Sequence, residues 1–158
     1  MSSPVRKLTP VAQSEPNAMV AIDNVTMAFG SFTAVQDVNL TVGDGEFLSI
    51  VGPTGCGKST ILNAIAGLLK PAKGSVSIDG APVNGVQNNI GYLFQQDALL
   101  PWKTAYQNVE LGLMFRGVQE AERRVKVMAW LEKVGLKGFE SRFPHMLSGG
   151  QRKRVQMA

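Results

Sequence analysis

The stretch that most constrains this chain is residues 52–60, GPTGCGKST, which matches the pattern G-x-x-x-x-G-K-[ST]. An apolar run at 47–51 precedes it, and a run with helical periodicity at 61–69 follows it. The predicted order is therefore strand, glycine loop, helix. A flexible Gly-rich turn is the competing interpretation, but ordinary Gly and Lys usage produces this pattern by chance in only about 0.5% of chains of this length. We call residues 52–60 the phosphate loop, because the sequence predicts that it binds nucleotide phosphates.

The residue types of the phosphate loop suit an anionic ligand. Its glycines allow successive backbone N–H groups to point inward at phosphate oxygens, where a Cβ would obstruct them. The helix predicted to begin near Lys58 adds the positive end of its dipole. Lys58 can reach the β- and γ-phosphates, and the Ser59 hydroxyl can complete a Mg²⁺ shell. We expect phosphate contacts from the whole loop: Gly52, Pro53, Thr54, Gly55, Cys56, Gly57, Lys58, Ser59 and Thr60.

Composition narrows the class of protein. With 158 residues, of which 44% are apolar and 18% charged, the chain is predicted to be a soluble globular domain. No apolar run approaches the roughly 18 residues of a membrane span, and a single cysteine excludes an internal disulfide. The net charge is +4, but the basic residues are scattered and no stacking aromatics interleave with them. The sequence therefore favours a cytosolic protein and predicts no nucleic-acid binding.

Periodicity and turn residues divide the chain into an α/β first half and a helical second half. Residues 1–18, with several prolines and serines, are predicted to be a disordered leader. Two strands within 19–42, with a kink at 23–24 and a turn at 30–31, should form a β-subdomain. Residues 98–147 should form a small helical subdomain. The other predicted elements are strands at 47–51, 74–80 and 89–94 and helices at 58–69, 104–116, 120–134 and 152–158.

A second glycine motif, LSGGQ at 147–151, is predicted to open a helix. Ser148 is a good N-cap, and the two glycines allow close approach of another group to the backbone. On its own the motif is equally well explained as a capped helix start in a Gly-rich turn. Its place downstream of the phosphate loop favours a functional motif.

With both motifs in place, the chain resembles the ATP-binding cassette (ABC) transporter family over residues 19–158. The phosphate loop matches the Walker A motif, and Gln95, directly after a strand phenylalanine, matches the Q-loop glutamine, although the adjacent Gln96 leaves that assignment open by one residue. Phe29 stands where the family places an aromatic that stacks on adenine, with a strand-end core residue as the alternative. The signature motif of the family is matched by Leu147, Ser148, Gly149, Gly150 and Gln151.

The resemblance implies a fold and a division of work. The fold would be an α/β P-loop NTPase core with an N-terminal antiparallel β-subdomain and an inserted helical subdomain. ATP and Mg²⁺ would be the cofactors, with Ser59 and Gln95 holding the metal. Ser148 and Gly150 would contact the γ-phosphate of ATP held by a second ATPase subunit in a head-to-tail dimer. ATP binding would hold the two subunits together and hydrolysis would release them. Permease subunits in the membrane would receive this movement, which places the protein peripherally at the cytoplasmic face of the membrane.

Three further segments narrow the resemblance to importer ATPases for nitrate, sulfonate, taurine or bicarbonate: Leu99–Trp102, Asn108-Val109 and Phe143–His145. An importer implies a solute-binding protein as an indirect partner, but the sequence does not identify the solute. His145 is the only histidine, and we interpret it as a packing or capping residue rather than the family's switch histidine. Cys56 is interpreted as a small filler of the phosphate loop.

The catalytic residues of the family are not found in these 158 residues. The resemblance implies an apolar Walker B strand ending in Asp-Glu, and later a switch histidine. The runs that end at Asp23 and Asp79 precede the expected positions and lack the Glu. We therefore expect the N-terminal part of an ATPase subunit, poorly soluble and without ATP turnover by itself. The alternatives are a non-hydrolysing truncated cassette that acts as an interaction module, and a soluble ABC ATPase acting on DNA or ribosomes, which the compact spacing of the motifs disfavours.

Overall fold

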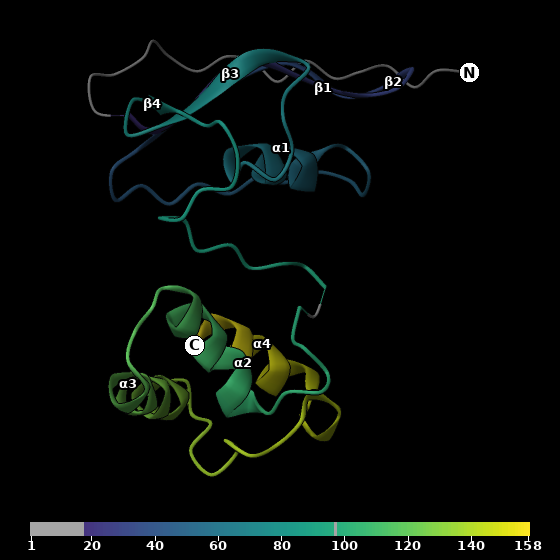
Figure 1. Cartoon of the computed structure of the whole chain (residues 1–158). Coiled ribbons are helices and arrows are strands. Elements are labelled where there is room, and N and C mark those ends of the chain that lie inside the picture. Colours follow the sequence, from purple (N-terminus) through teal and green to yellow (C-terminus); the bar gives the residue numbers. More distant parts are fainter. Residues whose placement is uncertain (1–17, 97) are drawn as a thin grey trace. The chain divides into compact units, whose positions relative to one another are not determined.

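The computed structural model describes residues 18–96 and 98–158, in two compact units that meet in sequence between Gly91 and Tyr92 (Figure 1). The predicted leader falls, for residues 1–17, outside the described residues, and Ala18 is already the first residue of a strand. Unit 1 contains β1 (Ala18–Phe29), β2 (Phe32–Gly43), α1 (Lys58–Ile65), β3 (Lys73–Ile78) and β4 (Ala81–Pro82). Unit 2 contains α2 (Ala105–Phe115), α3 (Glu120–Lys133), the 3₁₀ helix η1 (Pro144–Met146) and α4 (Gly149–Met157).

Unit 1 is built on an antiparallel sheet in the order β2-β1-β3-β4. Phe29 pairs with Phe32 across the turn that joins β1 to β2. Both strands are irregular, with positive φ at Asn24 (48°) and Asp37 (51°), residue types that tolerate this conformation better than most. The Asn24 N–H donates to Asn39 Oδ1 at 2.9 Å, and Asn39 Nδ2 donates to Asp37 O at 3.2 Å, so Asn39 links the two irregular places. The predicted kink and the predicted turn are both confirmed.

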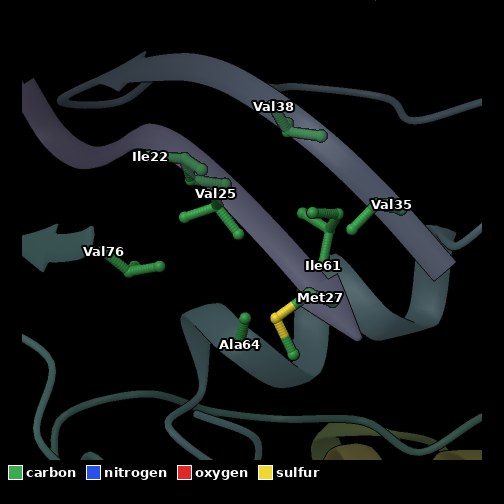
Figure 2. Packing of buried hydrophobic residues seen from close by; sticks show 8 residues of the cluster. All are labelled: Ile22, Val25, Met27, Val35, Val38, Ile61, Ala64 and Val76. Carbon is green, nitrogen blue, oxygen red and sulfur yellow. The ribbon is translucent and has the colours of Figure 1, made fainter. Parts of the chain in front are cut away.

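Helix α1 packs against this sheet and forms the core of unit 1 with it (Figure 2). Ile61 and Ala64 of the helix meet apolar side chains of β1 and β2, among which Val25 and Met27 are almost wholly out of contact with solvent. The buried cluster consists of Ile22, Val25, Met27, Val35, Val38, Ile61, Ala64 and Val76. Burial of these side chains fixes α1 against the sheet. The phosphate loop, which ends in α1, is therefore anchored by the core.

Helix α1 is shorter than predicted, because it ends at Ile65 and not at Leu69. Gly67 adopts a left-handed φ of 71°, and the Leu68 and Leu69 amides both donate to Asn63 O, at 2.9 and 3.2 Å. A left-handed glycine of this kind ends many helices. The glycine therefore ends α1 before the predicted end at Leu69.

Two predicted strands, at 47–51 and 89–94, are not formed. Neither segment has regular secondary structure, and the side chains of Phe47 and Val51 are 92% and 85% exposed. A strand is held by hydrogen bonds to a neighbouring strand, and within 18–96 and 98–158 no strand pairs with either segment. The prediction of these two strands is therefore wrong for this structure. The α/β class, with its antiparallel β-subdomain and helices, is confirmed.

Unit 2 is helical, and its helix bounds follow from capping. The Thr104 hydroxyl accepts the Gln107 N–H at 3.3 Å, and Gln107 Oε1 accepts the Thr104 N–H at 3.0 Å, a reciprocal capping box at the start of α2. Gly117 and Gly135, with φ of 72° and 71°, follow α2 and α3. The helices predicted at 104–116 and 120–134 are confirmed. The buried core of unit 2 consists of Ala105, Val127, Leu131, Leu136, Leu147 and Val155.

Candidate functional site

The phosphate loop needs glycine at two places for steric reasons. Gly57 has a φ of 96°, and a Cβ on it would lie 2.2 Å from Val35 Cγ1 of strand β2. A Cβ on Gly52 would lie 2.9 Å from Cys56 Sγ. Contacts this short force neighbouring atoms to move. The loop is thus curled tightly on itself and packed against β2, as a cradle for an anion requires.

Lys58 folds back over the loop from the first residue of α1. Its Nζ donates to Gly52 O at 2.9 Å and to Pro53 O at 2.7 Å, and it lies 3.6 Å from Cys56 Sγ. The ammonium is therefore held close to the backbone that the sequence predicts to surround the phosphates. A cation in this position supplies the charge that a polyphosphate needs.

The start of α1 adds donors to the same place. Gly57 is the N-cap, and no side chain caps the helix. The amides of the first turn have no intrahelical acceptor and can donate to a ligand. No acidic residue lies in that turn to compete for them, and Ser59 is exposed. These residues fit the phosphates of a nucleotide and, through the Ser59 hydroxyl, a Mg²⁺ ion.

A Mg²⁺ ion at this loop would depend on oxygen ligands from the nucleotide. Throughout the part of the chain that the structure describes, no group of three or more His, Cys, Asp or Glu side chains is placed to hold a metal. Mg²⁺ in proteins is often bound by one or two side chains together with substrate phosphates. The Ser59 hydroxyl is the oxygen that the phosphate loop could supply to such an ion.

Phe29 lies at the end of β1 in unit 1, and its side chain is 47% exposed. It is therefore not a core residue, which was the alternative to a stacking role. Its strand partner Phe32 is also exposed, at 62%. An open aromatic ring at a strand end is available to stack on a flat ligand.

The signature motif forms the first turn of α4 in unit 2. The Ser148 hydroxyl accepts the Gln151 N–H at 3.2 Å, and Gln151 Oε1 accepts the Ser148 N–H at 2.8 Å. Because this box closes the helix at Ser148, α4 begins at Gly149 and not at the predicted Arg152. Gly149 and Gly150 are exposed, and their amides belong to the turn that lacks intrahelical acceptors. The cap predicted at Ser148 is confirmed, and the motif presents bare amides to solvent.

Gln95 lies in unit 2, outside any helix or strand, and its side chain is exposed, as is that of Gln96. The structure brings the backbone of this segment to α4 through a residue that the sequence did not single out. Lys153 Nζ donates to Phe94 O at 3.0 Å and to Gln95 O at 2.9 Å. No pattern in the sequence indicates this contact, because its partners are backbone carbonyls 58 and 59 residues away.

Asn108 is a second residue whose role the sequence did not indicate. Its Oδ1 accepts the Leu100 N–H at 2.8 Å, and its Nδ2 donates to the carbonyls of Leu100, Lys103 and Thr104 at 2.9–3.2 Å. This side chain therefore shapes the loop before α2, on which Trp102 is 70% exposed. Leu99–Trp102 and Asn108 were both named for their family resemblance, and these hydrogen bonds join them in the structure.

The predicted site residues thus fall into two groups. The phosphate loop and Phe29 belong to unit 1, and Gln95 and the signature motif belong to unit 2. His145 stacks on Phe143, with ring centroids 5.8 Å apart, and Cys56 is an exposed thiol next to Lys58. No helix among the described residues is long and apolar enough to cross a membrane.

A glycine loop that leads into a helix through Gly-Lys-Ser, on a unit of mixed sheet and helix, defines a phosphate-loop nucleotide-binding protein. Comparison with known proteins gives the family. The chain belongs to the ABC transporter family, whose family model matches residues 35–158.

Relatives and solved structures agree with this assignment. The chain is 41% identical over 140 residues to the taurine import ATP-binding protein TauB of Yersinia pestis, covering 89% of this chain and 55% of TauB. It is similar in fold to the ATP-binding cassette MJ0796, in a dimeric post-hydrolysis state bound to ADP and Pi, with a TM-score of 0.78, 40% identity, and coverage of 88% of this chain and 67% of that one. It is also similar to cbiO1 of Clostridium perfringens, part of the ABC transporter complex cbiONQ, with a TM-score of 0.76, 27% identity, and coverage of 89% and 60%. The chain spans about half the length of the curated relatives it matches.

Proposed function

We propose that this chain is the nucleotide-binding part of the ATPase subunit of an ABC importer, which couples ATP binding and hydrolysis to solute uptake. The observation that carries the proposal is the phosphate loop, in which the Lys58 ammonium is held over a tightly curled backbone at the start of α1. A half-buried cation beside the first amides of a helix is a site for a polyphosphate. Family membership and the match to TauB support ATP as the nucleotide and import as the process.

The proposal assigns these roles to the predicted site residues. Lys58 and the loop amides bind the phosphates, and Ser59 and Gln95 hold Mg²⁺. Phe29 stacks on the adenine, which its exposed ring permits. Ser148 and Gly150 contact the γ-phosphate of ATP on a second ATPase subunit, because α4 presents its bare first-turn amides to solvent.

The partners follow from the same reasoning. A head-to-tail dimer is supported by the dimeric state of the similar cassette MJ0796. Permease subunits would dock on the helical part, where the loop shaped by Asn108 exposes Trp102. The subunit would then lie peripherally at the cytoplasmic face of the membrane, with a solute-binding protein as an indirect partner.

The 158 residues contain no apolar strand ending in Asp-Glu after the signature motif. For a polypeptide of these residues alone we therefore favour ATP binding without turnover, as in an interaction module. ATP hydrolysis needs a group that orients or activates the attacking water, in addition to phosphate and Mg²⁺ contacts. The proposed ATPase activity belongs to an assembly that supplies such a group.

Direct binding of ATP tests this proposal. Lys58→Met removes the ammonium and keeps the length of the side chain, so it should weaken ATP binding about 10- to 100-fold, the loss expected for charge-assisted hydrogen bonds. Isothermal titration of the purified chain with MgATP measures the change. Lys70→Met is the matched control, because Lys70 is an exposed lysine of the same unit beyond the end of α1. Equal affinity of the wild type and the Lys58 variant would refute the proposed site.

A further inference from the structure

Lys153 holds a segment that has no secondary structure of its own. Residues 92–96 lie outside any helix or strand, so no helical or sheet hydrogen bond fixes their carbonyls. The Lys153 ammonium donates to two of these carbonyls in succession, Phe94 O at 3.0 Å and Gln95 O at 2.9 Å. An ammonium has three donors, and Lys153 also donates to Gln156 Oε1 at 3.1 Å.

The other end of this contact is rigid. Lys153 lies on α4 two residues after the signature motif, and α4 is fixed by the capping box at Ser148 and by Val155, which is buried in the core of unit 2. Lys153 itself is partly buried. Charge-assisted bonds from a partly buried ammonium are stronger than neutral ones, because the charge polarises both carbonyls. The backbone position of Gln95 is therefore set from α4.

We propose that Lys153 is a positioning residue that joins the backbone of Gln95 to the signature helix, so that Gln95 and the signature motif move together. This inference rests on the proposed function, in which Gln95 holds the Mg²⁺ of one ATP and the signature motif contacts another. Lys153 touches neither nucleotide, and its effect passes through the carbonyl of Gln95. One lysine thereby links the two classes of nucleotide contact within unit 2.

Hydrogen exchange tests the tether without reference to activity. Lys153→Met keeps the apolar stem and removes the donors of both bonds to the segment, and it should speed amide exchange of residues 93–96 by about tenfold or more. Lys153→Arg keeps charge and donors and should restore the exchange rate of the wild type. Arg154→Met is the matched control: it removes a neighbouring cation of α4 whose partner is Val134 O, and it should leave exchange of 93–96 unchanged. Equal exchange in the wild type and Lys153→Met overturns the tether.

ATP binding with and without Mg²⁺ tests the positioning role. In the purified chain, ATP with MgCl₂ should bind more tightly than ATP with EDTA, and Lys153→Met should reduce that ratio by about three- to tenfold, with Mg²⁺-free affinity unchanged and the ratio restored in Lys153→Arg. A purely structural defect weakens both conditions equally. An unchanged ratio, or equal weakening in both, overturns the positioning role. A wild-type chain that binds no ATP in either condition refutes the proposed function itself.

Discussion

The phosphate loop has no room for an added Cβ at Gly57. Its φ of 96° is strained for any L side chain, and an added Cβ would meet Val35 Cγ1 at 2.2 Å. Gly55 has a similar φ of 82° but nothing within 4 Å of an added Cβ. A substitution at Gly55 therefore causes backbone strain alone, whereas one at Gly57 causes backbone strain and a steric clash.

We expect Gly57→Ala to lower the free energy of unfolding by about 2–4 kcal/mol, the sum of left-handed strain and overpacking. Gly55→Ala should cost only the strain, about 1–2 kcal/mol. Urea denaturation followed by circular dichroism measures both values. The double variant Gly57→Ala, Val35→Ala should lose less stability than the sum of the two single variants, since Val35→Ala removes the atom that clashes. Equal costs for the two alanine variants would contradict this account of the loop.

At the scale of elements, α4 shows how a cap and a binding motif share residues. The Ser148 hydroxyl caps the helix through the Gln151 N–H, and the exposed amides of the same turn form the proposed partner-ATP contact. Ser148→Ala removes the cap and should cost about 1 kcal/mol of stability. Ser148→Asp keeps a capping oxygen and should cost almost nothing, while its negative charge repels a phosphate at the same amides.

The two Ser148 variants therefore predict opposite orders in two assays. By urea denaturation, the aspartate variant should exceed the alanine variant in stability. By light scattering with ATP, in an assembly of complete subunits, the aspartate variant should dimerise less than the alanine variant. If the two variants rank the same way in both assays, the cap and the nucleotide contact are not separate functions of this turn.

The loop that leads to η1 is fixed to α2 by its backbone and by one carboxylate. Tyr106 N–H donates to Glu140 O at 2.9 Å, and Glu140 Oε1 accepts the Gly138 N–H at 2.8 Å. The hydrogen bond from Gly138 holds the pKa of Glu140 below its ordinary value of 4.5. A depressed carboxyl pKa contributes stability that is fully present above pH 4.5 and is lost as pH falls through the folded-state pKa.

We therefore expect Glu140→Gln to reduce the loss of stability of unit 2 between about pH 5 and pH 3, by at most about 1 kcal/mol because the group is partly solvated. At pH 7 the glutamine variant should be slightly less stable than the wild type. Thermal unfolding across this pH range gives the comparison. A variant with the same slope as the wild type would show that the Gly138 bond does not depend on the charge.

At the scale of the whole molecule, the sequence predicts features that depend on a few adjacent residues. These are the turn at 30–31, the caps at Thr104 and Ser148, and the helices before Gly117 and Gly135. The prediction was wrong for the end of α1, because the left-handed Gly67 ends the helix before the predicted Leu69. The contact of Lys153 with Phe94 and Gln95 could not be predicted from the sequence, because its acceptors are main-chain atoms distant in sequence.

The two missing strands have a different cause. Their apolar residues favour a strand, but a strand forms only with a partner, and the sequence pattern does not say where the partner comes from. In the unpaired segment 47–51, which precedes the phosphate loop, apolar side chains are left exposed: Phe47 by 92%, Leu48 by 39% and Val51 by 85%. An unpaired apolar segment of this kind is a template for association with other chains.

We therefore expect a polypeptide of these 158 residues to self-associate through residues 47–51. The double substitution Phe47→Ser and Val51→Ser should lower the associated fraction several-fold at fixed concentration, because it removes most of the exposed apolar surface of the segment. It should leave the melting of unit 1 almost unchanged, since neither side chain belongs to the buried cluster. Phe115→Ser, which removes an 81% exposed ring from the end of α2, is the matched control and should have little effect. Analytical ultracentrifugation measures the outcome, and equal association of the two variants would place the adhesive surface elsewhere.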